Sequence, residues 1–284
     1  MDLVSVVILT MGDRPKELSA AIESIRKQQG VKHEIVLVVN GGNPDTTLTD
    51  ISVNPLKNQG IPGGRNIGVS QSSGSYILFL DDDGTLIGED VLAGAVSEME
   101  NNAALGAIAL RILDENRKVT RRHHPRLRTK DHTAGYVTSF PGGASFHRKD
   151  AFTAVGGFCE DFFYGLEETD LSWRLYDSGW NIKYCPELEM YHPKTTPERH
   201  KSFFFTTARN RVWLSYRQLP MILGLSYILL WSLITCARNP RRLSVWKATL
   251  NGTIYGFQNK IGPRKPISWR TVITLTRLGR PPII

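Results

Sequence analysis

The chain has 284 residues, of which 41% are hydrophobic and 22% charged, so it can bury a full core and is not a disordered segment. Its three cysteines lie far apart without the spacing of metal ligands, which argues against a disulfide framework and a zinc site. Residues 1–192 hold 19 Lys and Arg against 26 Asp and Glu, whereas residues 193–284 hold 16 against 1. This asymmetry predicts an acidic body with a basic appendage, and such appendages usually meet the phosphates of nucleic acid or of an anionic membrane.

Strand and helix patterns alternate through the first 110 residues. Apolar runs predict strands at 3–9, 35–39, 76–81 and 106–110, and helical spacing predicts helices at about 14–28, 63–72 and 89–101. This βαβ rhythm predicts an α/β fold with a mostly parallel sheet covered by helices on both faces. The first apolar run is too short for a signal peptide and lacks its basic flank, so we expect the product to start in the cytoplasm.

The apolar run at residues 76–80 ends abruptly in Asp81, Asp82 and Asp83. Open α/β folds bind ligands at the carboxyl ends of their strands, so these carboxylates are expected at the ligand edge of the sheet. Three adjacent negative charges repel one another unless a cation lies among them. Oxygen ligands favour Mg²⁺ or Mn²⁺, which often bridges a protein to a diphosphate. The alternative is an acidic turn with solvated carboxylates.

Polar loops and a glycine-rich segment are expected at the same edge of the sheet. The loops begin at residues 10 and 40, directly after strands, where a nucleotide would lie at a switch point. The glycines of residues 58–68 allow close backbone approach at a helix start, although they could instead permit tight packing of helix on strand. The candidates for contacts to a nucleotide are Thr10, Asp13, Arg14, Asn40, Asn58, Gly64, Arg65, Asp81 and Asp82.

A second acidic cluster, Glu167, Glu168 and Asp170, opens a run with helical spacing. Negative charge is favourable in the first turn of a helix, so an ordinary helix N-terminus is the alternative interpretation. Two acidic clusters in one α/β chain favour a division in which one binds metal and the other transfers protons. His192 ends a later strand-like run, where a lone histidine is more often structural than a ligand. Residues 117–132 are strongly basic, either to receive a phosphate or as solvated surface.

Together these segments resemble the family 2 glycosyltransferases of the GT-A fold, with a match from about residue 3 to residue 217. The motifs that carry the resemblance are the strand with residues 10–14, the segment 58–68, the DxD-type triad 81–83, the glycine pair 142–143, and residues 167–171 with Arg174. Similar bacterial members include rhamnosyltransferases and galactofuranosyltransferases that build surface polysaccharide.

The resemblance implies an inverting transfer of a sugar from a nucleoside-diphosphate sugar to a hydroxyl group of an acceptor. It implies that Asp83 and Asp81, completed by His192, hold Mn²⁺ or Mg²⁺ on the donor's diphosphate. The catalytic base is implied at Glu168, where the family usually has aspartate, with Glu167 or Asp170 as fallbacks. A lipid-linked glycan or a polysaccharide precursor is the implied acceptor.

Residues 219–237 form an uncharged apolar stretch that, as a helix, would be ~28 Å long, close to the ~30 Å hydrocarbon core of a bilayer. A single crossing would export residues 238–284, which hold ten Lys and Arg and no acid, against the positive-inside tendency. We therefore expect a GT-A domain at 1–202 and a helical, membrane-associated region at 203–284 on the cytoplasmic face of a bacterial membrane. Spanning, or burial in a soluble core or a homo-oligomer, are the alternatives.

In the interfacial arrangement, aromatic residues are expected near the membrane surface and arginines against lipid phosphate. The aromatic residues are Phe203, Phe204, Phe205, Trp213, Tyr216 and Trp231, and the arginines are Arg238, Arg241 and Arg242.

Three rival functions fit the sequence less well. A sugar-phosphate nucleotidyltransferase would carry a basic Gly-rich loop directly after the first strand, and this chain does not. A degenerate transferase-like module for binding glycan or membrane would not need the acids at 81–83 and 167–170. Nucleic-acid binding by the basic region fits poorly with the apolar and aromatic content of residues 203–237, so no nucleic-acid partner is expected.

Overall fold

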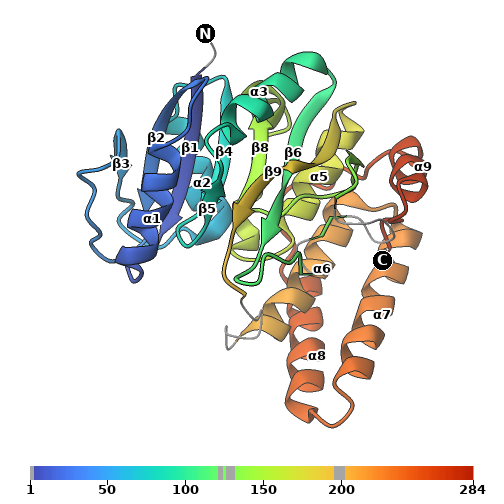
Figure 1. The fold of residues 1–284 in the computed structure, drawn as a ribbon. Helices are drawn as coiled ribbons and strands as arrows, with labels where there is room; N and C mark the ends of the chain where they lie inside the picture. The colour runs from blue at the N-terminus through green and yellow to red at the C-terminus, as the bar shows by residue number, and fades with distance from the viewer. Residues whose placement is uncertain (1–2, 121–123, 126–131, 195–201, 284) are drawn as a thin grey trace.

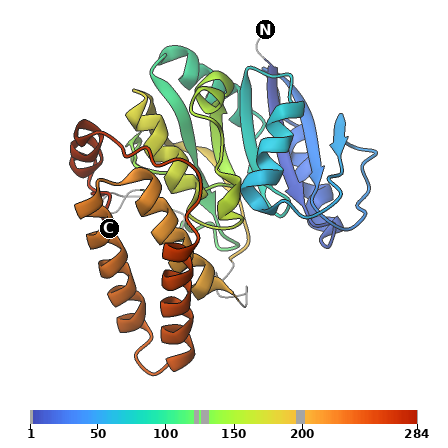
Figure 2. The ribbon, with the colours of Figure 1, turned by 180° about the vertical axis from the view of Figure 1, so that it is seen from behind.

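The computed structural model describes residues 3–120, 124–125, 132–194 and 202–283. A mixed β-sheet with helices on both faces forms the body, and a helical region at the C-terminus projects from one end of it (Figures 1 and 2). The strands are β1 (Leu3–Thr10), β2 (Lys32–Val39), β3 (Ile51–Val53), β4 (Tyr76–Asp81), β5 (Thr85–Ile87), β6 (Leu105–Leu113), β7 (Gly135–Tyr136), β8 (Ala144–Arg148) and β9 (Asn181–Tyr191). The helices are α1 (Pro15–Arg26), α2 (Gly60–Gln71), α3 (Val91–Asn101), α4 (Lys149–Ala154), α5 (Glu167–Asp177), α6 (Phe203–Gln218), α7 (Met221–Arg238), α8 (Leu243–Gln258) and α9 (Trp269–Arg277), with a short 3₁₀ turn, η1, at Glu160–Phe162.

Among the described residues, the strands are ordered β3-β2-β1-β4-β8-β6-β9-β5, and β7 pairs with β9. The first half of the sheet is parallel, as expected from the βαβ rhythm: β1 pairs in parallel with β2 and β4, and β2 with β3. The second half is mixed, because β8 runs antiparallel between β4 and β6. The expected strands and helices of the first 110 residues all form, with ends shifted by at most three residues.

Alternation of side chains along β1 explains why both faces of the sheet are covered. Val4, Val6 and Ile8 point into a core shared with α1 and α3, whereas Val7 points into a second core on the opposite face. Helix α2 packs closely on that opposite face. A Cβ atom at Gly64 would lie 2.3 Å from Leu9 Cδ1, so only glycine permits this approach.

Gly64 is therefore a packing residue of α2, which is the alternative interpretation of the glycine-rich segment. Its expected contact to the nucleotide stays a prediction, since the packing against Leu9 concerns the side of the helix that faces β1. The glycine allows α2 to lie close to β1, and this short distance sets the position of Arg65 one residue later.

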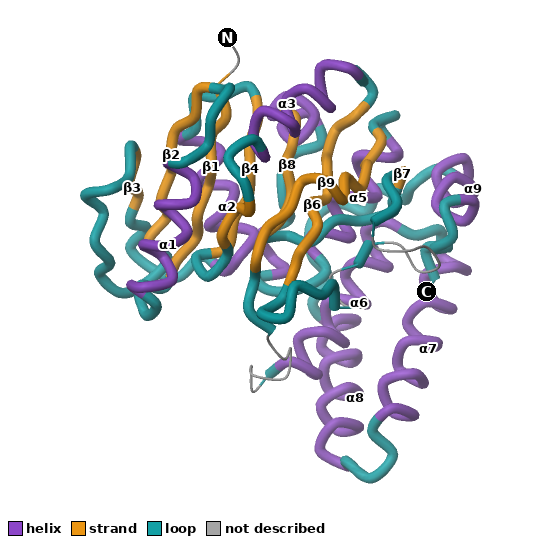
Figure 3. Tube along the Cα trace, in the orientation of Figure 1, coloured by secondary structure: helices purple, strands orange, loops and turns teal. Residues whose placement is uncertain are grey.

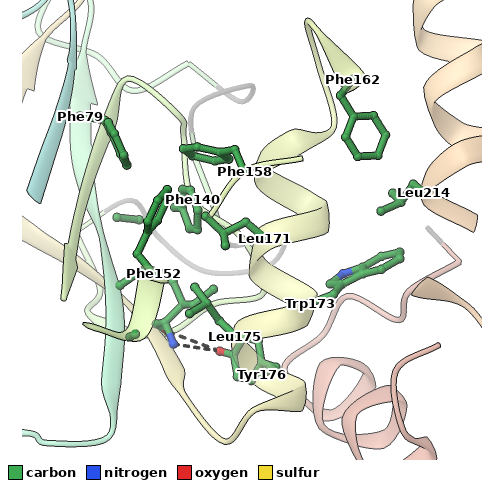
Figure 4. Close-up of a cluster of buried hydrophobic side chains, with 14 of the residues drawn as sticks. Phe79, Phe140, Phe152, Phe158, Phe162, Leu171, Trp173, Leu175, Tyr176 and Leu214 are labelled. Atoms are coloured by element: carbon green, nitrogen blue, oxygen red, sulfur yellow. Dashed lines mark hydrogen bonds between the residues drawn. The ribbon is translucent and has the colours of Figure 1, made fainter. Parts of the chain in front are cut away.

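One apolar cluster connects the sheet to the C-terminal helices. Figure 4 shows Phe79 of β4 at one side of this cluster, Leu171 of α5 in the middle and Leu214 of α6 at the other side. Trp213, expected at a membrane surface, is instead 5% exposed and donates its indole N–H to the carbonyl oxygen of Asn259. Its position beside charged Arg209 and under α8 decides this burial, which composition alone does not reveal. The domain boundary after residue 202 stays a prediction.

Helices α7 and α8 form a hairpin that extends away from the sheet, as the tube view in Figure 3 shows. Helix α7 is the one helix in the described part of the chain that is long and apolar enough to cross a membrane, with a mean hydropathy of 1.6. Only 17% of it is buried within this chain. Most apolar residues of α7 are therefore not covered by other parts of the described chain.

Candidate active site

The three carboxylates at the end of β4 differ in how far they are exposed to solvent. The side chain of Asp81 is 40% exposed, whereas those of Asp82 and Asp83 are 3% and 6% exposed. Asp82 accepts a hydrogen bond of 2.7 Å from Thr10 Oγ1 and pairs with Arg14 Nη2 at 2.9 Å. Arg14 also pairs with Asp83. Thus Thr10 and Arg14, expected to contact a nucleotide, hold the triad at the carboxyl edge of β1 and β4.

His192, which follows β9 directly, faces this triad. Its Nε2 atom lies 3.2 Å from Asp83 Oδ1 and 3.6 Å from Asp81 Oδ2. Its Nδ1 lies 2.7 Å from the carbonyl oxygen of Pro193, which can only accept a hydrogen bond, so Nδ1 carries a proton. Burial lowers the pKa of His192, but the hydrogen bonds and negative charges of Asp81 and Asp83 outweigh it and raise the pKa to about 10.

These residues fit a divalent metal ion. One ligand atom from each of Asp81, Asp83 and His192 lies within 4.8 Å of the others. The Nδ1 contact to Pro193 leaves Nε2 as the nitrogen that presents a lone pair to the carboxylates once the ring is neutral, as a metal ligand requires. Two carboxylates and an imidazole suit Mn²⁺ and are compatible with Mg²⁺.

Arg65 connects the triad to the second acidic cluster. Its guanidinium is 6% exposed, with Nη2 3.0 Å from Asp81 Oδ1 and Nη1 3.9 Å from Glu168 Oε1. The guanidinium also lies 5.7 Å from the ring centroid of Phe79. Arg65 therefore holds a positive charge between the expected metal site and the expected base, which lie far apart in the sequence.

The glycine pair Gly142 and Gly143 makes this arrangement possible. A Cβ atom at Gly142 would lie 2.3 Å from both Arg65 Nη1 and Glu168 Oε1. A Cβ atom at Gly143 would lie 2.0 Å from Asp81 Cγ. Both distances are far below van der Waals contact, so the acids pack directly against the backbone of this segment, which only glycine allows.

Helix α5 begins with Glu167 and Glu168, but the two side chains differ. Glu168 is 26% exposed and lines the cavity described below. Glu167 is 1% exposed, and its Oε2 atom has no hydrogen-bond partner in the part of the chain that the structure describes. Burial and the charge of Glu168 raise the pKa of Glu167 well above its usual range, although Arg65 opposes this. Glu167 thus favours its protonated form and is a poor proton acceptor.

Asp170, the other fallback for the base, is fully buried and does not line the cavity. It accepts hydrogen bonds from Arg174, from Arg217 at 3.2 Å and from Gln218 at 2.9 Å. These contacts join α5 to α6, so the geometry gives Asp170 a structural position. Glu167 and Glu168 both line the cavity, but of the three acids expected as a base only Glu168 has an appreciably exposed side chain.

The turn before α5 contains residues with strained backbone angles, and α6 holds it in place. Leu166 has a φ of 72°, and Phe163 has a φ of 61°, both in the left-handed region that only glycine adopts freely. Asn210 of α6 is fully buried, and its amide donates to the carbonyl oxygens of Phe162, Tyr164 and Gly165. The C-terminal region therefore fixes the direction in which Glu168 points.

The remaining nucleotide candidates lie at the edges of β1 and β2. Asn40 is 3% exposed and donates to Asn58 Oδ1 at 3.0 Å, while its own Oδ1 accepts from the Gln59 N–H at 2.8 Å. Asn40 and Asn58 thus shape the loop that leads into α2. Asp13 has a side chain that is 68% exposed, 3.8 Å from the Arg14 guanidinium. None of these residues lines the cavity described below, and their expected contacts to a nucleotide stay a prediction.

A cavity of about 540 Å³ adjoins both acidic clusters. Asp81, His192, Arg65 and Glu168 line one side of it. The other side comes from the C-terminal region, whose lining residues are Phe203, Thr207, Arg211, Tyr227, Trp231, Arg280, Pro281 and Pro282. Trp231, expected at a membrane surface, instead faces this cavity.

The sequence pattern did not indicate this second wall. Arg211 and Arg280 are two among many basic residues after position 193, and no local motif marks them. The basic segment 117–132 lies largely outside the described residues, so its expected role in phosphate binding stays a prediction.

The arrangement of a parallel half-sheet, acids at the end of β4 and an acid at the start of α5 defines a nucleotide-sugar transferase of the GT-A fold. The chain matches the model of glycosyl transferase family 2 over residues 5–156, more than half of its length, and it belongs to this family.

Curated relatives agree at the level of the family. Over 69 residues the chain is 36% identical to the N-acetylglucosaminyl-diphospho-decaprenol L-rhamnosyltransferase of Mycobacterium tuberculosis, covering 24% of this chain and 22% of the relative. Over 170 residues it is 25% identical to the poly-beta-1,6-N-acetyl-D-glucosamine synthase of Staphylococcus aureus, covering 53% and 40%. The chain thus spans less than half the length of the curated relatives it matches.

Solved structures share the fold. TarS 1-349 of S. aureus in complex with UDP-GlcNAc superposes with a TM-score of 0.65 at 15% identity, covering 97% of this chain and 84% of that one. The mannosyltransferase PcManGT of Pyrobaculum calidifontis in complex with GDP-Man and Mn²⁺ gives 0.58 at 14% identity, covering 96% and 78%. At these identities the likeness establishes the fold alone.

Proposed function

We propose that this chain transfers a sugar, with inversion at the anomeric carbon, from a nucleoside-diphosphate sugar to a hydroxyl of a lipid-linked glycan or polysaccharide precursor. The observation that carries the proposal is that one cavity adjoins both the cluster of Asp81, Asp83 and His192 and the carboxylate of Glu168. A base and a site for the leaving diphosphate must flank the same reacting carbon, and these two groups adjoin the same cavity from different elements.

In the proposed reaction, Glu168 accepts the proton of the acceptor hydroxyl as its oxygen attacks the anomeric carbon. The new C–O bond forms while the bond from that carbon to the diphosphate oxygen breaks, and the diphosphate leaves with the electron pair. A Mn²⁺ or Mg²⁺ ion held by Asp81, Asp83 and His192 would offset the charge that develops on the leaving group. Arg65 orients both Asp81 and Glu168 and adds a fixed positive charge between them.

The nucleoside would lie at the carboxyl ends of β1 and β2, next to the cavity. Asp13, which is exposed, and the loop ordered by Asn40 and Asn58 are the polar groups available there. Thr10 and Arg14 act one step removed, by holding Asp82 and Asp83.

The acceptor side is proposed to lie at the cytoplasmic face of an anionic membrane. Helix α7 exposes an apolar stripe at every third or fourth position, formed by Met221, Ile222, Leu225, Leu229 and Leu233. Helix α8 exposes a second stripe, formed by Leu243, Trp246, Leu250, Ile254 and Phe257. Arg238, Arg241 and Arg242 lie at the end of the hairpin, where they can meet lipid phosphate.

Donor binding is tested by titrating the protein with UDP, dTDP and GDP, with and without Mn²⁺, while following thermal stability. A metal-dependent rise for one nucleotide that is lost in Asp83→Ala is the expected result. Folded protein that responds to no nucleotide would instead favour a degenerate module that binds glycan or membrane.

Membrane binding is tested by sedimentation with vesicles of phosphatidylglycerol or phosphatidylcholine. We expect binding to the anionic vesicles, lost in the double variant Leu225→Glu, Leu229→Glu. Leu56→Glu is the matched control, because Leu56 is fully exposed in the loop between β3 and α2, away from the hairpin. Equal binding by the double variant would show that the hairpin does not contact lipid.

A further inference from the structure

The wall of the cavity that faces the acidic clusters carries two arginines. Arg211 comes from α6, and Arg280 follows α9 near the end of the chain. Tyr227 and Trp231, one turn apart on α7, lie in the same wall. Four side chains from three separate segments thus converge on one side of a single cavity.

Stacking on an aromatic ring and a hydrogen bond hold Arg211 in place. Its guanidinium lies 4.3 Å from the ring centroid of Trp231, and Nη1 donates to Thr235 Oγ1 at 3.1 Å. Its Nε atom is buried without a hydrogen-bond partner, and no carboxylate of the described residues forms an ion pair with Arg211. Burial lowers the pKa of Arg211, and the charge of Arg238 adds to this, although Tyr227 opposes.

Arg280 lines the same cavity as Tyr227. Its Nη1 donates to Ser139 Oγ at 3.2 Å, which fastens the end of the chain to the segment before Gly142. Burial lowers the pKa of Arg280, with Tyr227 opposing. Burial also raises the pKa of the Tyr227 phenol, and both arginines act against that change. Both guanidinium groups therefore lie close enough to the Tyr227 hydroxyl to act on it electrostatically.

A buried arginine normally pairs with a carboxylate, because an uncompensated charge in a protein interior is unfavourable. Arg211 has no such partner among the described residues, and the sequence after position 193 contains one acidic residue, Glu198. A fork of N–H donors stacked on an aromatic ring is well suited to the oxygens of a phosphate.

We propose that Arg211, Arg280 and the Tyr227 hydroxyl form a subsite for a phosphate or diphosphate group carried by the acceptor. This inference rests on the proposed function and names its acceptor class as a phosphate-bearing one. The donor's diphosphate is expected at Asp81, Asp83 and His192, and the arginines are separate from that cluster, so this second cationic group is available to the other substrate.

The position of the subsite on α7 also supports the acceptor assignment. Tyr227 and Trp231 face the cavity, while Leu225, Leu229 and Leu233 of the same helix are exposed on another side. An apolar chain attached to a phosphate at Arg211 would therefore have an apolar surface to follow out of the cavity.

The test uses farnesyl diphosphate as a probe, titrated calorimetrically into the full chain in EDTA, so that binding through a metal ion is excluded. We expect saturable binding by the wild type, about tenfold or more weaker binding by Arg211→Gln and by Arg280→Gln, and no binding of farnesol. Arg277→Gln is the matched control, because Arg277 is exposed three residues before Arg280 and should bind like the wild type.

Two further measurements separate the sources of the phosphate. The affinity for the nucleoside diphosphate with Mn²⁺ should be unchanged in Arg211→Gln and Arg280→Gln, and so should sedimentation with phosphatidylglycerol vesicles. Loss of nucleotide affinity would assign the arginines to the donor, and loss of vesicle binding would assign them to a lipid headgroup; either result overturns the proposal. A nucleotide response without any binding of farnesyl diphosphate would reject the subsite and leave the transferase function standing.

Arg211→Lys is a second variant, for the case in which Arg211→Gln does not fold. If Arg211→Gln fails to melt cooperatively, the lysine variant keeps the charge but loses the fork, and we expect it to weaken the probe by severalfold with an unchanged melting temperature. Wild-type affinity in both Arg211→Lys and Arg280→Gln would refute the subsite.

Discussion

Replacing Glu168 by glutamine tests the assignment of the catalytic base. The amide keeps the size of the side chain and its place beside Arg65 but cannot accept a proton from the acceptor. Glu168 lines the cavity with a 26% exposed side chain, so the substitution leaves the core intact. We therefore expect an effect on chemistry without an effect on folding.

The expected magnitude follows from general base catalysis, which contributes about 10²–10⁴-fold to rate. At about 1.4 kcal/mol per factor of ten, this corresponds to a rise of roughly 3–5 kcal/mol in the activation barrier. Donor affinity should change little, because the diphosphate is expected at Asp81, Asp83 and His192 and not at Glu168. The loss should thus appear in kcat, with KM for the donor within about twofold.

Neighbouring acids supply the controls. Glu167→Gln should keep kcat within severalfold, because the buried Glu167 carboxyl already favours its protonated form and glutamine mimics it. Asp170→Asn should lower the free energy of unfolding by about 3–5 kcal/mol, because it removes the counter-charge of Arg174 and Arg217. Its activity per folded molecule should suffer less than that of Glu168→Gln.

The assay is single-turnover release of the nucleoside diphosphate from the donor identified by titration, with circular dichroism as the measure of folding. Activity of Glu168→Gln within about threefold of the wild type would refute Glu168 as the base. An equal loss in Glu167→Gln would show that the exposure of the two side chains does not decide which one acts.

Three further substitutions test the packing around the site. Glu167→Gln should raise the melting temperature, because the raised pKa of Glu167 makes the wild-type protein most stable below the unfolded pKa of about 4.3 and less stable as pH rises toward the folded pKa. The difference in melting temperature between variant and wild type should therefore widen from pH 4 to pH 8, and a constant difference would contradict the burial argument. Gly143→Ala should displace the Asp81 carboxylate, whose Cγ would lie 2.0 Å from the new Cβ, and weaken Mn²⁺-dependent nucleotide binding by about tenfold or more in calorimetry, whereas unchanged binding would exclude a role for Asp81. Asn210→Ala removes the amide that donates to the carbonyl oxygens of Tyr164 and Gly165, while that of Phe162 keeps Arg209 as a donor, and should cost about 2–4 kcal/mol in urea unfolding. A cost below about 1 kcal/mol would mean that the turn is stable without Asn210.

Local sequence patterns were enough to predict most of the strands and helices in the catalytic half of the chain. Alternating apolar runs and helical spacing predict β1, α1, β2, α2, β4, α3 and β6, because each element has a period that a short window of sequence reveals. The same patterns place Asp81 and Asp83 at a strand end and Glu168 at a helix start. The antiparallel insertion of β8 between β4 and β6 was not predictable in this way, since strand order depends on pairing between distant segments.

The sequence by itself determined the family, the order of the elements and the residue types of the two acidic clusters. Only the tertiary structure decided which acid is accessible, because Glu167, Glu168 and Asp170 differ in burial and partners and not in local pattern. The structure likewise turned Gly64 into a packing residue and brought Arg211 and Arg280 to the wall of the cavity. The physical reason is that burial and ion pairing are set by contacts between segments far apart in the chain, which no local periodicity records.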